Sequence, residues 1–169
     1  MINFSVTQYG KPLDKSKYNW DKKTKTFSTI EDNLILDFSE VEGVTFKTGL
    51  CCAFKTGSEC TFKTGSYCTF KTGSECAFKT GLYCTFKTGS DCIFKTGSNC
   101  TFDTGSNCVV VRSDIFEVIQ LTNEENHIKL NLEGVKGYKD IEVKHVITID
   151  GKDVELSKES YENLKKQLV

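Results

Sequence analysis

Cysteine is the residue type in this chain that most strongly suggests chemistry, because a thiol can bind a metal, form a disulfide or act as a nucleophile. The 169-residue sequence contains nine cysteines and two histidines. Zinc sites favour cysteine pairs about two to four residues apart with histidine nearby. Here the cysteines recur every eight residues, and His127 and His145 lie outside that region. The pattern therefore favours packing over metal binding or cross-linking, and we predict free thiols.

Other catalytic motifs are also missing from the sequence. No serine or cysteine motif surrounds the two histidines, and there is no phosphate-binding glycine loop. Glu59, Glu75 and Asp91 recur every sixteen residues, which predicts a ladder of carboxylates and not a converging pair. A thin solenoid also offers little of the concavity that an active site needs. We therefore predict a non-enzymatic protein with no cofactor and no bound metal.

The cysteines belong to an octapeptide, Phe-Lys-Thr-Gly-x-x-Cys-x, that is repeated eight times from Phe46 through Cys108, with Asp in place of Lys in the last copy. The alternation around Cys and Phe predicts a short strand with both side chains on one side. The Thr-Gly-Ser segment predicts a turn in which glycine takes a positive φ. Such a repeat is typical of a solenoid. The repeated core residues are Cys52, Cys60, Cys68, Cys76, Cys84, Cys92, Cys100 and Cys108, with Phe46, Phe54, Phe62, Phe70, Phe78, Phe86, Phe94 and Phe102.

The residue before each cysteine decides how many octapeptides make one coil. Every second unit has an acid or Asn there (Glu59, Glu75, Asp91, Asn107), and the alternate units have Cys51, Tyr67, Tyr83 and Asn99. A period of 24 residues would mix glutamate with tyrosine, whereas a period of 16 separates them. We therefore predict an all-β fold, a two-sided solenoid with 16-residue coils and two parallel sheets. Opposed strands would set the cysteines of one sheet against the phenylalanines of the other, which fills a thin core.

The solenoid frame can be extended beyond the perfect repeat. Counting back by eight residues places Val44 and then the pair Leu36 and Phe38 at inward positions. Counting forward places Val110 and then the pair Phe116 and Val118 at inward positions. The predicted organisation is therefore an N-terminal cap at residues 1–33, a solenoid at 34–119 and a C-terminal cap at 120–169.

Both caps contain further strand signals. In the N-terminal cap, YNWDKKTKTFSTI predicts a hairpin closed between Asp21 and Lys25, with Trp20 in the core. In the C-terminal cap, Asp150-Gly151 predicts the turn of a second hairpin. Ser157 predicts the N-cap of a short helix. Its apolar face would carry Tyr161, Leu164 and Leu168.

Charge and composition limit the partners. The net charge is −1, and the repeat itself has seven lysines against four acids, which is far from the basic surface of a nucleic-acid-binding protein. The start of the chain lacks a signal peptide and no apolar run could span a membrane. We expect a protein of the cytosol, the host cytosol or a virion, with protein partners (itself or other structural subunits). Neither a membrane nor nucleic acid is expected as a partner.

Outward lysines form one row on each predicted sheet, namely 47, 63, 79 and 95 on one and 55, 71 and 87 on the other. Stacked like charges cost stability, but they favour solubility and oppose lateral association of sheets. A stripe that binds a polyanion is the alternative interpretation.

The octapeptides resemble short-repeat β-solenoids in general. The segment YNWDKKTKTF, followed by LILDFSEVEGVTFKTG and the cysteine-bearing octapeptides, resembles phage- and prophage-type structural proteins. This resemblance implies a structural protein of a virus or mobile element. The nine-residue calcium-binding rolls share the strand-and-turn plan, but their aspartate-bearing turns are replaced here by TGS and TGL, so calcium binding is not implied.

Two functional hypotheses remain. The first is a structural or scaffolding protein whose solenoid is a rigid rod. The alternative is a binding module for a carbohydrate, a protein partner or ice. Ice is less favoured because lysines flank the single threonine row. The candidate binding face comprises Tyr67, Tyr83, Thr69, Thr85 and Thr101.

Overall fold

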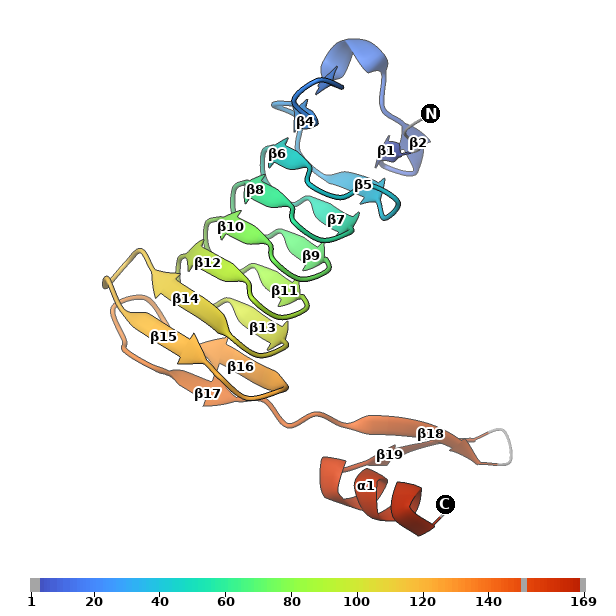
Figure 1. Cartoon of the computed structure of the whole chain (residues 1–169), viewed down its shortest axis with the longest axis vertical. Helices are drawn as coiled ribbons and strands as arrows, with labels where there is room; N and C mark the ends of the chain where they lie inside the picture. Colours follow the sequence, from blue (N-terminus) through green and yellow to red (C-terminus); the bar gives the residue numbers. More distant parts are fainter. Residues whose placement is uncertain (1–3, 150–151, 168–169) are drawn as a thin grey trace. The chain divides into compact units, whose positions relative to one another are not determined.

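The computed structural model describes residues 4–149 and 152–167. The chain forms two compact units, residues 1–139 and residues 140–169. The first unit contains the stacked coils of a two-sided β-solenoid, built from two long sheets (Figure 1). The predicted fold class and the 16-residue coil are confirmed, because Phe62 aligns with Phe78 and Phe70 with Phe86 in parallel strand pairs.

Sheet B is the eight-stranded sheet, and its strands from β4 to β14 run parallel to their neighbours. An antiparallel strand closes it at each end, β3 on β4 and β15 on β14. In spatial order its strands are β3 (Asn19–Asp21), β4 (Thr26–Ser28), β6 (Thr45–Lys47), β8 (Thr61–Lys63), β10 (Ala77–Lys79), β12 (Ile93–Thr96), β14 (Cys108–Arg112) and β15 (Val118–Leu121).

Sheet A is the nine-stranded sheet, and its strands from β5 to β13 are parallel. Antiparallel strands again close both ends, β1 on β5 and β16 on β13. A 3-10 helix at Lys15–Lys17 precedes β3. In spatial order the strands are β2 (Lys11–Pro12), β1 (Ser5–Gln8), β5 (Leu34–Phe38), β7 (Ala53–Thr56), β9 (Thr69–Lys71), β11 (Thr85–Lys87), β13 (Thr101–Thr104), β16 (Asn126–Leu130) and β17 (Tyr138–Asp140).

The core is a double column of phenylalanine rings. Within each sheet the rings stack almost parallel, as between Phe62 and Phe78, whose centroids are 4.8 Å apart. Across the core the rings meet edge to face, as between Phe54 and Phe62 at 5.3 Å. Both arrangements are favourable aromatic geometries. The predicted opposition of cysteine to phenylalanine is therefore wrong, because phenylalanine faces phenylalanine across the centre.

The cysteines line the corners of the coil beside a threonine. At one corner, Thr96 Oγ1 lies 3.0 Å from Cys100 Sγ. Both side chains are fully buried. Each octapeptide therefore has three inward positions, with Phe in the middle and Thr and Cys at the corners, and each coil has two such sets. The small size of Cys suits the narrow corner of the coil.

The turns use a different backbone conformation from the predicted one. The octapeptide glycines do not take a positive φ, whereas the residue before each cysteine does, with φ between 54° and 60°. Glycine is required by the distance between coils, because a Cβ atom on Gly73 would lie 2.2 Å from Ser58 Oγ and 3.0 Å from Ser58 N. The backbone stacks directly there, with Gly73 N donating to Gly57 O at 3.2 Å.

The predicted frame fails at the N-terminal end of the repeat. Leu36 aligns with Phe54, eighteen residues later, so Leu36 occupies a phenylalanine position and not the predicted cysteine position. Phe27 aligns with Phe46, nineteen residues later, which makes β4 a parallel strand of the solenoid inside the predicted cap. The additional residues enlarge the turns, where Gly43 has a φ of 67°. The predicted hairpin near Asp21 is present as β3 and β4.

The predicted frame also fails at the C-terminal end. Phe116 and Val118 were expected to point inward, but their side chains are 88% and 61% exposed. Phe116 has a φ of 54° in the turn that reverses the chain, so β15 returns antiparallel to β14. Ile119 and Leu121 on β15 are buried instead. The parallel stack therefore ends at β14, and residues 120–139 close it as part of the same unit.

The second unit consists of a hairpin and a helix. The hairpin pairs β18 (His145–Ile149) with β19 (Lys152–Leu156), and the predicted turn at Asp150-Gly151 lies outside the described residues. Helix α1 spans Lys158–Gln167, and Ser157 Oγ accepts a hydrogen bond from Ser160 N at 3.2 Å, which confirms the predicted N-cap. Tyr161 stacks on His145 with centroids 4.2 Å apart, and Leu168 lies outside the described residues.

Candidate functional site

The two tyrosines of the predicted binding face form an ordered, exposed pair. Tyr67 and Tyr83 lie in the turns that lead from sheet B to sheet A, here called the B-to-A turns, with φ values of 60° and 55°. Their rings are nearly parallel, with centroids 5.2 Å apart and an interplanar angle of 2°. The side chains are 58% and 48% exposed. The tyrosines therefore lie at a corner of the coil. The alternation in the sequence had instead suggested that they lie on a flat strand.

The predicted threonine row lies on the adjacent strands of sheet A. Thr69 aligns with Thr85, and Thr85 aligns with Thr101. The first two threonines are exposed and Thr101 is half-buried. Each threonine comes two residues after the residue of the B-to-A turn that precedes the cysteine, so the five predicted residues share one edge of the solenoid.

The ring arrangement limits what this edge can bind. The facing sides of Tyr67 and Tyr83 cover each other at 5.2 Å. One face, the edge and the hydroxyl group of each ring lie outside this stack.

The cysteine row is buried, and its thiols form hydrogen bonds inside the coil. All nine cysteines are free thiols, and only Cys51 is exposed. The buried thiols stabilise the turns, since Cys60 Sγ donates to Ser58 O at 3.3 Å and Cys100 Sγ accepts a hydrogen bond from Cys84 N at 3.3 Å. The Cys100 thiol and burial together raise the pKa of the Cys84 thiol to about 11. A protonated, inaccessible thiol of this kind is a poor nucleophile.

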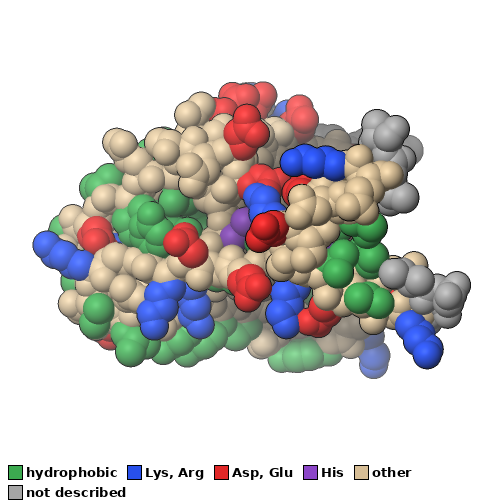
Figure 2. Space-filling view, turned by 90° about the horizontal axis from the view of Figure 1, so that it is seen from below, with side chains coloured by type: hydrophobic (Ala, Val, Ile, Leu, Met, Phe, Trp, Pro, Cys, Tyr) green, Lys and Arg blue, Asp and Glu red, His purple; other side chains and the backbone are tan. Residues whose placement is uncertain are grey.

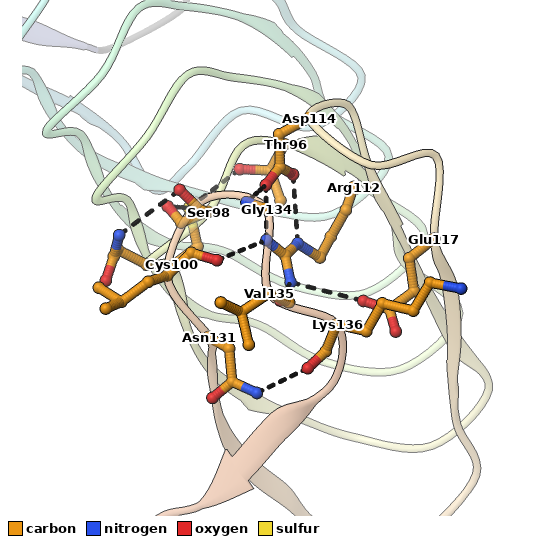
Figure 3. Close-up of polar contacts among 12 residues, drawn as sticks. Thr96, Ser98, Cys100, Arg112, Asp114, Glu117, Asn131, Gly134, Val135 and Lys136 are labelled. Atoms are coloured by element: carbon orange, nitrogen blue, oxygen red, sulfur yellow. Dashed lines mark hydrogen bonds and ion pairs between the residues drawn. The ribbon is translucent and has the colours of Figure 1, made fainter.

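The structure shows a buried ion cluster that the sequence interpretation missed. Arg112, at the end of β14, is fully buried. Its guanidinium contacts Asp114 at 2.6 Å and Glu117 at 3.5 Å, and it also donates to the carbonyl groups of Leu132 and Val135 (Figure 3). Alternation along Cys108, Val110 and Arg112 was the signal that could have placed this arginine inward.

This ion cluster forms hydrogen bonds with the loop between β16 and β17. Asp114 Oδ2 accepts a hydrogen bond from Gly134 N at 3.3 Å, and Glu117 Oε1 accepts one from Gly137 N at 2.9 Å. Burial raises the pKa of Asp114, but the hydrogen bonds from Arg112 and Gly134 outweigh it and hold the pKa below its usual value. All polar groups of the cluster are engaged within the protein, so its role is to close the end of the solenoid.

Within the described ranges, no three His, Cys, Asp or Glu side chains are placed to hold a metal ion. Figure 2 shows one face of the molecule, on which acidic and basic side chains are interspersed. Of the helices in the described part of the chain, none has both the length and the apolar character needed to cross a membrane.

Comparison of the chain with known protein families, with curated proteins and with solved structures found no match.

Proposed function

We propose that the chain is a non-enzymatic structural protein in which the solenoid is a rigid rod of defined length. The observation that carries this proposal is the closure of both sheets at both ends by antiparallel strands, β1 and β3 at one end and β15 and β16 at the other. Open strand edges would otherwise invite end-to-end association of copies.

The rigidity follows from the contacts between coils. Two aromatic columns run without interruption through the repeat, with centroids about 5 Å apart along each column. The backbone of the turns is also bonded from coil to coil, as from Gly81 N to Gly65 O at 3.2 Å. A rod of this kind suits a scaffold within an assembly, in keeping with the resemblance to phage-type structural proteins. The hairpin and helix at residues 140–169 would then serve as its attachment module.

Changing the length by one coil tests this proposal. Deleting residues 70–85 removes one coil and keeps the faces in register, whereas deleting residues 70–77 removes one octapeptide and exchanges the two sheets. Spin labels on the exposed Cys51 and on a Lys129→Cys variant report the length of the rod. The coil deletion should shorten the distance by about 4.8 Å, one strand spacing, and keep its distribution narrow. A broad distribution, or equal tolerance of the two deletions, would contradict the rigid two-sided rod.

A second candidate function is a binding module that uses the tyrosine and threonine edge. The exposed, aligned pair of Tyr67 and Tyr83 favours it, because surface aromatic side chains are common anchors of protein partners. A Tyr67→Ala, Tyr83→Ala double variant should lose partner capture without a lower melting temperature. The matched control is Glu59→Ala with Glu75→Ala at the equivalent positions of the opposite turns. Equal loss in both variants would rule out a specific edge.

A further inference from the structure

The two lysine rows of the solenoid differ in their surroundings. On sheet A, Lys55 pairs with Asp37 at 3.4 Å, and Lys87 pairs with Asp103 at 3.1 Å. On sheet B, no lysine of the row forms an ion pair with any residue in the described ranges. The sheet B row comprises Lys47, Lys63, Lys79 and Lys95, aligned in register and exposed.

Within the described residues, the acidic side chains of the repeat form no ion pair with the sheet B row. Glu59, Glu75 and Asp91 occupy the turns that lead from sheet A to sheet B. The lysines of sheet B precede the opposite turns, in which Tyr67 and Tyr83 occupy the equivalent positions. The sheet B row is therefore an uncompensated line of positive charge with a repeat of about 4.8 Å.

A hollow adjoins the N-terminal end of this row. It has a volume of about 590 Å³ and begins where β4, β6 and β8 lead into the B-to-A turns. Beside the hollow, the side chain of Ile30 is 94% exposed. The lining residues are Ser28, Thr29, Ile30, Lys47, Thr48, Lys63, Thr64 and Gly65.

The chemistry of the hollow fits an acidic sugar. The hydroxyl group of Ser28, which aligns with Lys47, can bond to a hydroxyl group of a pyranose, and two lysine ammonium groups match a carboxylate or sulfate. Ile30 offers an apolar surface for the carbon face of the ring. The spacing along the row is close to the length of one sugar unit in an extended chain.

We propose that the hollow and the sheet B lysine row together bind a linear acidic polysaccharide. The first sugar occupies the hollow beside Lys47 and Lys63, and the following units run along the row past Lys79 and Lys95. Single-stranded nucleic acid fits less well, because binding of that kind uses aromatic rings with free faces for the bases. Of the residues that line the hollow, none is aromatic.

Calorimetric titration of the full chain with a hexamer of galacturonic acid at low salt tests the proposal. We expect saturable binding that weakens with added salt, because exposed charges are screened. Lys47→Gln with Lys63→Gln should weaken binding by about tenfold or more. Ser28→Ala should weaken it at constant charge. The matched control is Lys55→Gln with Lys71→Gln, at the equivalent positions of sheet A, which should bind like the unmodified chain.

Several results would overturn the proposal. No binding of the hexamer at low salt would exclude the site. Equal weakening by the sheet A control would show attraction to net charge alone. Tight binding of the methyl-esterified, uncharged hexamer would exclude recognition by the lysines. Binding of oligothymidylate with equal affinity and equal sensitivity to Lys47→Gln with Lys63→Gln would indicate a nucleic-acid surface. Retained melting temperatures show that each variant is folded.

Discussion

Replacement of Gly73 by alanine tests whether the distance between coils, and not backbone conformation, requires glycine in the octapeptide. Gly73 has no positive φ, so alanine could adopt its backbone without conformational strain. The new Cβ atom would lie 2.2 Å from Ser58 Oγ, 3.0 Å from Ser58 N and 3.1 Å from Ser58 Cα in the preceding coil. Two of these three contacts are with the backbone, which a change of side-chain rotamer cannot relieve.

The sign of the effect follows from two opposing terms. Gly→Ala at a site with room stabilises a protein by about 0.4–1 kcal/mol, because the unfolded chain loses entropy. Overpacking a close contact costs about 1–3 kcal/mol. The coils cannot separate at Gly73 without stretching the 3.2 Å hydrogen bond from Gly73 N to Gly57 O. The steric term should therefore dominate, with a net loss of about 1–2 kcal/mol in the free energy of unfolding.

Urea unfolding followed by circular dichroism measures this loss, and the chain offers a graded comparison. At Gly97 the nearest atom to a new Cβ is Leu82 Cδ2 at 2.3 Å, the end of a flexible side chain, so Gly97→Ala should cost less than Gly73→Ala. In a Ser58→Ala background the Oγ contact disappears but the backbone contacts remain, and Gly73→Ala should still destabilise. A gain in stability from Gly73→Ala, or full recovery in that background, would refute the role assigned to coil spacing.

Three further predictions concern the turns, the end of the solenoid and the thiols. Glu75→Asn should raise the free energy of unfolding by about 0.5–1 kcal/mol, because Glu75 has a φ of 57° and asparagine tolerates this region better; a loss in urea titration would contradict this. Arg112→Met should lower the melting temperature and cost about 3 kcal/mol, because it leaves the carboxylate of Asp114 without its buried partner; unchanged melting would mean that the ion cluster does not hold the end. The raised pKa of Cys84, about 11, means that its contribution to stability is complete below the unfolded pKa of about 8.5 and is lost as pH rises toward the folded value. Urea midpoints should therefore fall between pH 8.5 and 11 by an amount that Cys84→Ala reduces, and an equal fall in that variant would refute the assignment to this thiol.

The coil length could be predicted because the repeat carries information in its variable positions. Glutamate and tyrosine alternate before the cysteines, and the structure places them in two different sets of turns. The inward position of the phenylalanines followed from strand alternation and is confirmed by their burial. These two features depend only on the alternation of residues within a strand and on the period of the variable positions, both of which can be read from the sequence.

Other features depended on geometry that alternation does not encode. The residue before each cysteine takes a positive φ, so the strand begins later than expected and the cysteine moves from the sheet to the corner. We predicted that glycine is needed for a positive φ in the turn. It is needed instead because a side chain there would collide with the turn of the neighbouring coil. The five candidate residues accordingly lie along one edge at a corner of the coil, and not on the flat face that was predicted. The eight-residue spacing could not be extended beyond the repeat at either end, because the turns there differ in length from those of the octapeptides.

The position of Asp103 explains why the repeat stops where it does. It replaces lysine in the last octapeptide, and its carboxylate lies 3.1 Å from Lys87 Nζ and 3.2 Å from His127 Nδ1 on β16. A lysine at this position would extend the like-charge row, whereas aspartate ends it with an ion pair to Lys87 on one side and a contact with His127 on the other. The strand order changes from parallel to antiparallel at the same place, where β16 pairs with β13. Charge pattern and strand direction therefore change together, which indicates that the final octapeptide is adapted to hold the closing strand. The repeat thus specifies its own end as well as its period.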